Sequence, residues 1–339
     1  MLLKFFKGYQ PTNLILIIFL TIIFWLRVFL DETNSGIYID QNPLPLYGLI
    51  MELFVSLDYP FLNKLIALLF ILFQAILIAS INNHFNLLGY RSYLPSLIFV
   101  LVTINFTQYQ LLHPILFSNS LFLIAWIKIK KAHGKQKALT NYFDASLLIG
   151  LASLFYFNII YLILILWINT LISRPGSFKE LSIALFGPII IWYLFFSFYF
   201  ITYNTSYNIF DLFSFDPGFS DFTSLSVTNQ IMVLFFLILI IMASFALFRY
   251  YSSLNINIRK NLKLFFYLFT LGHLIIFFTN SSLELIYMIA VPVSLFLSLF
   301  LVNLKSKLFG DIFFILMFLI TIANVFFADI INSGISHLW

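Results

Sequence analysis

The chain has no cysteine and very few charged residues. The absence of cysteine from all 339 positions excludes disulfides, thiolate catalysis and cysteine-ligated metal sites. Asp, Glu, Lys and Arg make up 9% of the residues, whereas a soluble domain carries roughly 25%. The hydrophobic fraction is 62% and the mean hydropathy is +1.02. Because a soluble fold could not cover its surface with so few polar groups, the composition predicts a membrane protein.

Several functional signatures are also missing from the sequence. It has no glycine-rich phosphate-binding loop, no histidine cluster at metal-ligand spacing and no arginine-rich voltage-sensor helix. No internal repeat is evident, which weakens the case for a secondary transporter. The net charge of +5 is spread between apolar runs, so it predicts no nucleic-acid partner.

Apolar runs long enough to cross a bilayer recur along the whole chain. They predict an all-α fold, a polytopic transmembrane bundle of about 10–11 spans formed by a single domain, 1–339. The first run follows Lys4 and Lys7 and lacks a small-residue cleavage site, so we interpret it as a retained span. The candidate single spans are 13–30, 61–80, 92–107, 111–127, 181–202, 230–247, 264–279, 283–302 and 309–327.

The apolar run 147–172 is long for one span and has basic loops on both sides. Because both basic loops must lie on the cytoplasmic side, the run has to cross the membrane an even number of times. We therefore interpret it as two short helices with a break near 156–158. The two helices either cross the membrane or enter it and return on the same side. Interrupted helices at membrane depth often mark binding sites. The alternative is that the run forms one long helix and that one of the neighbouring loops is assigned to the wrong side of the membrane.

The distribution of basic residues predicts the orientation. With the N-terminus in the cytoplasm, every Lys and Arg except Arg27 and Lys64 falls on the cytoplasmic side, as the positive-inside rule requires. Most acidic residues fall on the outer side. The expected location is the bacterial cytoplasmic (inner) membrane, with membrane lipids as partners.

Two outer loops are long enough to hold structure of their own. The first, 31–60, contains an apolar stretch, 46–55, that predicts an amphipathic helix on the membrane surface. The second, 204–228, interleaves acids with aromatic residues. That pattern suits a loop over a groove, and it equally suits an ordinary aromatic belt.

Arg27, Asp31 and Glu32 lie together at the outer mouth of the first span. Arg27 and Asp31 are four residues apart and share a helix face, so they can pair. The adjacent carboxylates Asp31 and Glu32 are candidate catalytic residues: one can act as a general base, or the pair can bind a divalent cation with phosphate oxygens. The ordinary alternative is a charged helix end with a local salt bridge.

Arg27 and three further residues on the outer side are candidates for binding a lipid phosphate. Lys64 breaks the basic-inside pattern, His113 precedes Pro114 in a tight turn, and Asp40 lies in the first outer loop. Cations beside carboxylates suit a phosphorylated headgroup. The alternatives are a snorkelling interfacial lysine and a solvated turn histidine.

In layout the chain resembles the GT-C glycosyltransferases, multi-span enzymes that use polyprenyl-phosphate sugars. The resemblance rests on the acidic pair Asp31–Glu32, the surface helix 46–55, the turn at His113–Pro114 and the paired short helices 147–172. It covers the first half of the chain and implies a base or metal contact at Asp31 or Glu32. The turn 108–114 lacks the second acidic motif that many members carry, and no large soluble C-terminal domain follows. The chain also looks like a group of functionally unassigned bacterial multi-span proteins.

Three functions follow as expectations. The first is a transferase at the outer face that takes a sugar from a polyprenyl-phosphate carrier, with a divalent cation as the one cofactor the acidic pair would serve. The second is a non-enzymatic membrane subunit of an envelope secretion or export assembly, with membrane-protein partners. The third is a lipid or small-molecule transporter.

Overall fold

The computed structural model describes residues 6–31, 35–40, 43–106, 110–132, 138–173, 178–203, 226–279, 285–304 and 306–336. Within these ranges the chain forms helices and one isolated parallel β-bridge between Ile37 and Leu112. The all-α class expected from composition is therefore confirmed. The 3-10 segments are η2 (Phe157–Leu162) and η5 (Tyr251–Ser253). The α-helices are α2 (Pro11–Leu30), α3 (Pro45–Leu57), α4 (Pro60–Phe85), α5 (Leu94–Ile104), α6 (Pro114–Ala132), α7 (Leu139–Ser153), α8 (Ile163–Ser173), α9 (Phe178–Tyr203), α10 (Val227–Tyr250), α11 (Ile256–Thr279), α12 (Ile286–Asn303) and α13 (Lys307–Ser336).

Proline starts many of these helices. Pro11, Pro45, Pro60 and Pro114 each occupy the first residue of a helix, where the N–H that proline lacks would have no helical partner. Helices α3 and α4 end at residues in the left-handed conformation, Asp58 and Asn86. Asn and Asp tolerate this conformation better than other non-glycine residues.

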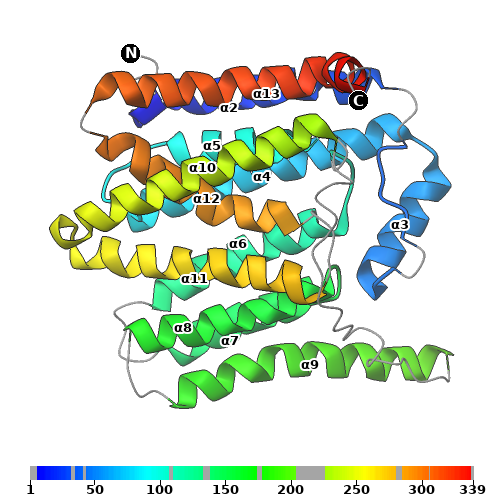
Figure 1. Ribbon diagram of the computed structural model, residues 1–339. Helices are drawn as coiled ribbons and strands as arrows, with labels where there is room; N and C mark the ends of the chain where they lie inside the picture. Colours follow the sequence, from blue (N-terminus) through cyan, green and yellow to red (C-terminus); the bar gives the residue numbers. More distant parts are fainter. Residues whose placement is uncertain are drawn as a thin grey trace.

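Except for α3, the helices run roughly along one axis, and successive helices point in opposite directions (Figure 1). Seven of them, α2, α4, α9, α10, α11, α12 and α13, are long and apolar enough to cross a membrane. Helices α5, α6, α7 and α8 run alongside these seven, whereas α3 lies beyond one end of the bundle (Figure 1). The chain is a multi-pass membrane protein.

The two ends of the bundle differ in charge. The basic end, at the left of Figure 1, holds the start of α2 and the turn 86–93, with Lys7, Arg91 and Arg249. The acidic end, at the right, holds the end of α2 together with α3, and carries Asp31, Asp40, Glu52 and Asp58. The first outer loop of the sequence prediction lies at the acidic end.

Helices α5 and α12 form the centre of the bundle. Every residue of α5 is buried, as is every residue of α12 from Tyr287 to Leu301. At the periphery, α9 and α10 expose large apolar side chains such as Ile201 and Phe248. A membrane-spanning bundle presents such faces to lipid tails, which need no polar cover.

Helix α5 is shorter than the expected span 92–107. It covers Leu94–Ile104, which is about 16 Å of rise against a hydrocarbon core of about 30 Å. The chain beyond its end is held by side chains of other helices. Asn105 donates to the Thr321 hydroxyl at 3.1 Å, and Asn324 donates to the Asn105 carbonyl. These bonds allow the helix to stop inside the bundle.

The run 147–172 is broken, as its length indicated, but the first helix starts earlier. Helix α7 ends at Ser153 and η2 begins at Phe157, while α7 already begins at Leu139. The polar residues of its first turns have partners on neighbouring helices: Asp144 pairs with Lys128 at 2.8 Å, and Tyr142 accepts from Asn169 at 2.8 Å. Of the second outer loop, 204–228, residues 204–225 lie outside the described residues.

Candidate functional site

At the acidic end, two segments far apart in sequence are bonded to each other. The Leu112 N–H donates to the Gly36 carbonyl at 2.7 Å, and the Tyr38 N–H donates to the Leu112 carbonyl at 3.1 Å. The Tyr47 hydroxyl of α3 donates to the carbonyls of Leu112, at 3.0 Å, and Tyr38. We call the joined segments 35–40 and 110–113 the frame. They lie between α3 and the start of α4.

Helix α4 packs against the frame at a position where only glycine fits. Gly36 has φ +73°, and a Cβ there would lie 2.8 Å from the Pro60 carbonyl oxygen and 2.9 Å from Lys64 Cγ. Glycine adopts this left-handed conformation at no steric cost. Next to it, Asn63 donates to the Ser35 carbonyl at 3.1 Å. The first turn of α4 is thereby fixed to the frame.

Lys64, expected to contact a lipid phosphate, is 3% exposed, and its ammonium group donates to the main-chain carbonyl of Asp31. That carbonyl follows the last residue of α2, where unpaired carbonyls and the helix dipole favour a cation. The Lys64 ammonium group therefore stabilises the end of α2.

Arg27 and Asp31 lie one turn apart at the end of α2. Arg27 is half-buried and donates to the Val325 carbonyl of α13. The Asp31 N–H donates to the Arg27 carbonyl at 3.1 Å, and Asp31 itself is exposed. Asp31 therefore stands at the rim of the acidic end on a fixed backbone. Glu32, the other candidate catalytic residue, lies outside the described residues.

His113, the expected turn histidine, is 0% exposed. Its ring lies 4.4 Å from the Tyr38 ring, measured between centroids, and its Nδ1 accepts from the Ile115 N–H at 3.2 Å. The imidazole thus packs against Tyr38 within the frame and satisfies one N–H of the first turn of α6. Asp40, half-buried, ends the described segment 35–40.

The structure brings all five described candidates to the acidic end. Asp31 and Lys64 are in direct contact, Arg27 is joined to Asp31 through the backbone, and Asp40 and His113 belong to the frame. Sequence reasoning missed the residues that build the frame, because no local pattern pairs residue 36 with residue 112. Gly36 and Tyr38, which lie inside the first outer loop, were the available sequence signal. The missed residues are Gly36, Tyr38, Tyr47 and Asn63.

Within the described residues, no group of three or more His, Asp or Glu side chains is placed to hold a metal ion. Asp31 is the described carboxylate at the end of α2, and one carboxylate is too few, because divalent cations take several oxygen ligands. The divalent cation stays a prediction that depends on Asp31 together with Glu32.

Comparison with known proteins gives no relative: no family model, no curated protein and no solved structure matches this chain.

Proposed function

We propose that the protein is a GT-C-like glycosyltransferase of the bacterial inner membrane, working at its acidic end on the outer face. It would transfer a sugar from a polyprenyl-phosphate carrier to an acceptor hydroxyl. The observation that carries this proposal is Asp31: an exposed carboxylate at the mouth of the first span, on a backbone held by Lys64 from α4.

In this mechanism Asp31 is the general base. It removes the proton from the acceptor hydroxyl as the oxygen attacks the anomeric carbon and the carrier phosphate leaves. A positioned base contributes about 10²–10⁴-fold to rate. Glu32, next in sequence, is the second carboxylate of the proposed pair. Lys64 and His113 are positioning residues, since both are buried and bonded to the main chain.

The lipid carrier would approach along α3. That helix lies outside the bundle, and it packs through Tyr47 while exposing Leu49 and Leu53, 65% and 54% exposed. An apolar exposed face on a short helix suits the interface of a bilayer. It would place the prenyl tail beside the rim that carries Asp31.

The test is release of free polyprenyl phosphate by the purified protein in liposomes, supplied with a panel of undecaprenyl-phosphate sugars and acceptors. We expect Asp31→Asn to reduce release by about 100-fold or more, because the base is lost. Glu52→Gln is the matched control, since Glu52 is an exposed carboxylate at the same end, on α3. Full activity in a double Asp31→Asn, Glu32→Gln variant would contradict the proposal.

A second candidate is a non-enzymatic membrane subunit of an envelope secretion or export assembly. It is favoured by the burial of Lys64 and His113, because cations and imidazoles committed to the main chain do not bind a ligand phosphate. This function predicts a stoichiometric complex with defined membrane partners, stable in mild detergent and cross-linked in native membranes. Purification as a lone monomer from cross-linked membranes would contradict it.

A further inference from the structure

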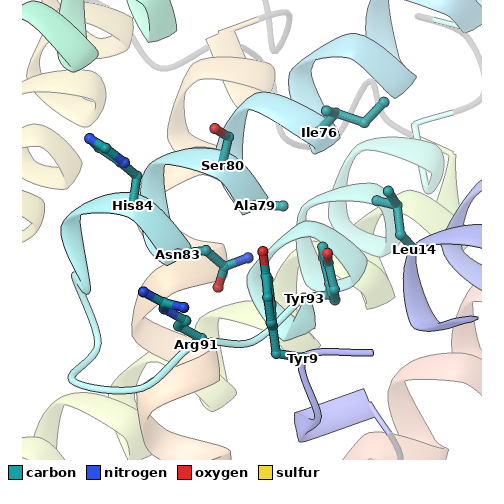
Figure 2. A pocket seen from close by; sticks show the side chains of 9 residues that line it. All are labelled: Tyr9, Leu14, Ile76, Ala79, Ser80, Asn83, His84, Arg91 and Tyr93. Atoms are coloured by element: carbon teal, nitrogen blue, oxygen red, sulfur yellow. The ribbon is translucent and has the colours of Figure 1, made fainter. Parts of the chain in front are cut away.

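A pocket opens at the basic end, at the opposite end of α4 from Lys64. Its volume is about 410 Å³, and it is lined by the last turns of α4, the start of α2 and the turn 86–93 (Figure 2). From Lys64 to His84, which lines the pocket, α4 rises by about 30 Å. None of the five predicted site residues that the structure describes lines this pocket.

One side of the pocket is polar and basic. Arg91 and His84 line it, with Asn83 between them (Figure 2). The Oδ1 atom of Asn83 accepts from the Ser92 N–H at 2.8 Å, so its NH₂ group is turned toward Tyr9 (Figure 2). Among the described residues that line the pocket, none is acidic. The polar side therefore offers hydrogen-bond donors and positive charge to a ligand.

Two stacked tyrosines hold the cation in place. The Arg91 guanidinium carbon lies 5.9 Å from the centroid of the Tyr9 ring, and Tyr9 stacks on Tyr93 with centroids 5.2 Å apart and an interplanar angle of 10°. A guanidinium stacked on an aromatic face keeps its N–H edges available for a phosphate. Burial raises the pKa of Tyr93, and neighbouring Tyr9 adds to the effect.

The opposite side of the pocket is apolar and reaches the lipid-facing surface. Leu14 and Ile76 line it, and Ile76 is 41% exposed. Along the same helices, Ile15 and Phe73 expose their side chains. A ligand whose anionic group meets Arg91 would thus have its apolar part alongside α2 and α4, where acyl chains lie.

We propose that this pocket binds the phosphate headgroup of an anionic lipid from the leaflet at the basic end. Arg91 makes the charge-assisted bonds to the phosphate oxygens, and Asn83 and the tyrosines supply neutral donors. A second cation stands close by: Lys7 lies 5.9 Å from the ring centroid of Tyr90, the neighbour of Arg91. Cations near the membrane surface attract anionic lipids, and the pocket gives one such lipid a defined binding site. The site is independent of the proposed transferase, since it lies at the other end of the bundle.

The experiment is native mass spectrometry of the full chain released from mixed vesicles of phosphatidylglycerol and phosphatidylcholine. We expect the wild type to retain phosphatidylglycerol preferentially, and Arg91→Gln to lower its occupancy by about tenfold, as loss of one charged hydrogen-bond donor predicts. Arg249→Gln is the matched control, because Arg249 is an exposed arginine at the same end outside the pocket. It should change occupancy by less than about twofold.

A second variant keeps the charge and fills the space. Ser80→Trp places a large ring in the pocket wall, and we expect the same loss of phosphatidylglycerol. Equal losses in Arg91→Gln and Arg249→Gln would overturn the proposal, since binding would then follow overall charge. Retention by Ser80→Trp at the wild-type level would also overturn it. Complete displacement of the lipid by millimolar inorganic phosphate would assign the pocket to a soluble phosphate compound and overturn the lipid assignment.

Discussion

The two ends of the bundle use cations in opposite ways. At the acidic end, Lys64 is buried and donates to a main-chain carbonyl, and the neighbouring loops are bonded into a closed frame. At the basic end, Arg91 is exposed and stacked on Tyr9 beside an open pocket. At the acidic end, where the sequence predicted the functional site, the cations bind main-chain carbonyls. At the basic end, which the sequence analysis used only to set the orientation, Arg91 lines a pocket that a ligand can enter.

The difference shows that charge placement alone does not identify a binding site. Lys64 and Arg27 were candidates because they break the basic-inside pattern. The structure shows both donating to main-chain carbonyls, of Asp31 and Val325. Asp31, by contrast, is exposed. Three matched pairs of substitutions test this contrast, in order of decreasing effect.

The largest effect is expected at two glycines with positive φ, one at each end. Gly36→Ala should lower the free energy of unfolding by about 3 kcal/mol, because the new Cβ meets the Pro60 carbonyl oxygen as well as straining the backbone. Gly89→Ala meets only the tip of Ile258, which can rotate away, so about 1 kcal/mol is expected. Denaturant unfolding in detergent measures both. Equal losses would mean that the frame is no more tightly packed than the basic end.

The second pair compares two buried lysines, Lys64 and Lys130. In a chain carrying His113→Cys, the substitution Lys64→Met should raise the maleimide labelling rate of that cysteine about tenfold. The end of α2, which leads into the frame, loses a charged hydrogen bond to the Asp31 carbonyl, and 1.4 kcal/mol multiplies the open population by ten. Lys130 donates to Asn261 at 2.6 Å at the basic end, so Lys130→Met should leave the rate unchanged. A rate unaffected by Lys64→Met would show that Lys64 does not hold the frame closed.

The smallest effect is expected at two tyrosine hydroxyls. Tyr47→Phe removes the donor to Leu112 and Tyr38 and should cost about 1 kcal/mol of unfolding free energy. Tyr90 donates once, to Ser298 at 3.2 Å, so Tyr90→Phe should cost about 0.5 kcal/mol. Thermal unfolding of both variants side by side gives the comparison. A larger loss of unfolding free energy for Tyr90→Phe than for Tyr47→Phe would contradict the expectation that the acidic end is the more tightly bonded of the two.

The long apolar runs, separated by short loops, predicted the helical bundle, because each crossing of the bilayer needs a continuous apolar segment. They failed where side chains override the pattern. Helix α7 begins at Leu139, before the apolar run, since Asp144 and Tyr142 find partners on other helices. Helix α5 ends at Ile104, inside its run, since Asn105 is held by Thr321 and Asn324. All four of these bonds join residues that lie at least 16 positions apart in sequence.

The candidate site was predictable in position but not in accessibility. The sequence located Arg27, Asp31, Asp40, Lys64 and His113 at one end, and the structure places them there. Whether each is exposed depends on the pairing of the frame, which no local pattern specifies. The pocket at the basic end was missed because Tyr9, Asn83 and Arg91 come from three segments. The local sequence signal for this pocket was Arg91, which lies two residues before Tyr93.

The measurement that tests the contrast most directly is labelling of single cysteines by a membrane-impermeant maleimide, on membrane vesicles of both orientations. The chain has no native cysteine, so Asp31→Cys, His113→Cys and Ser80→Cys each report one site. We predict rapid labelling of Asp31→Cys from one side only, rapid labelling of Ser80→Cys from the opposite side only, and labelling of His113→Cys at least about tenfold slower than Asp31→Cys. Labelling of His113→Cys as fast as Asp31→Cys would show that the acidic end is open, and would contradict the account.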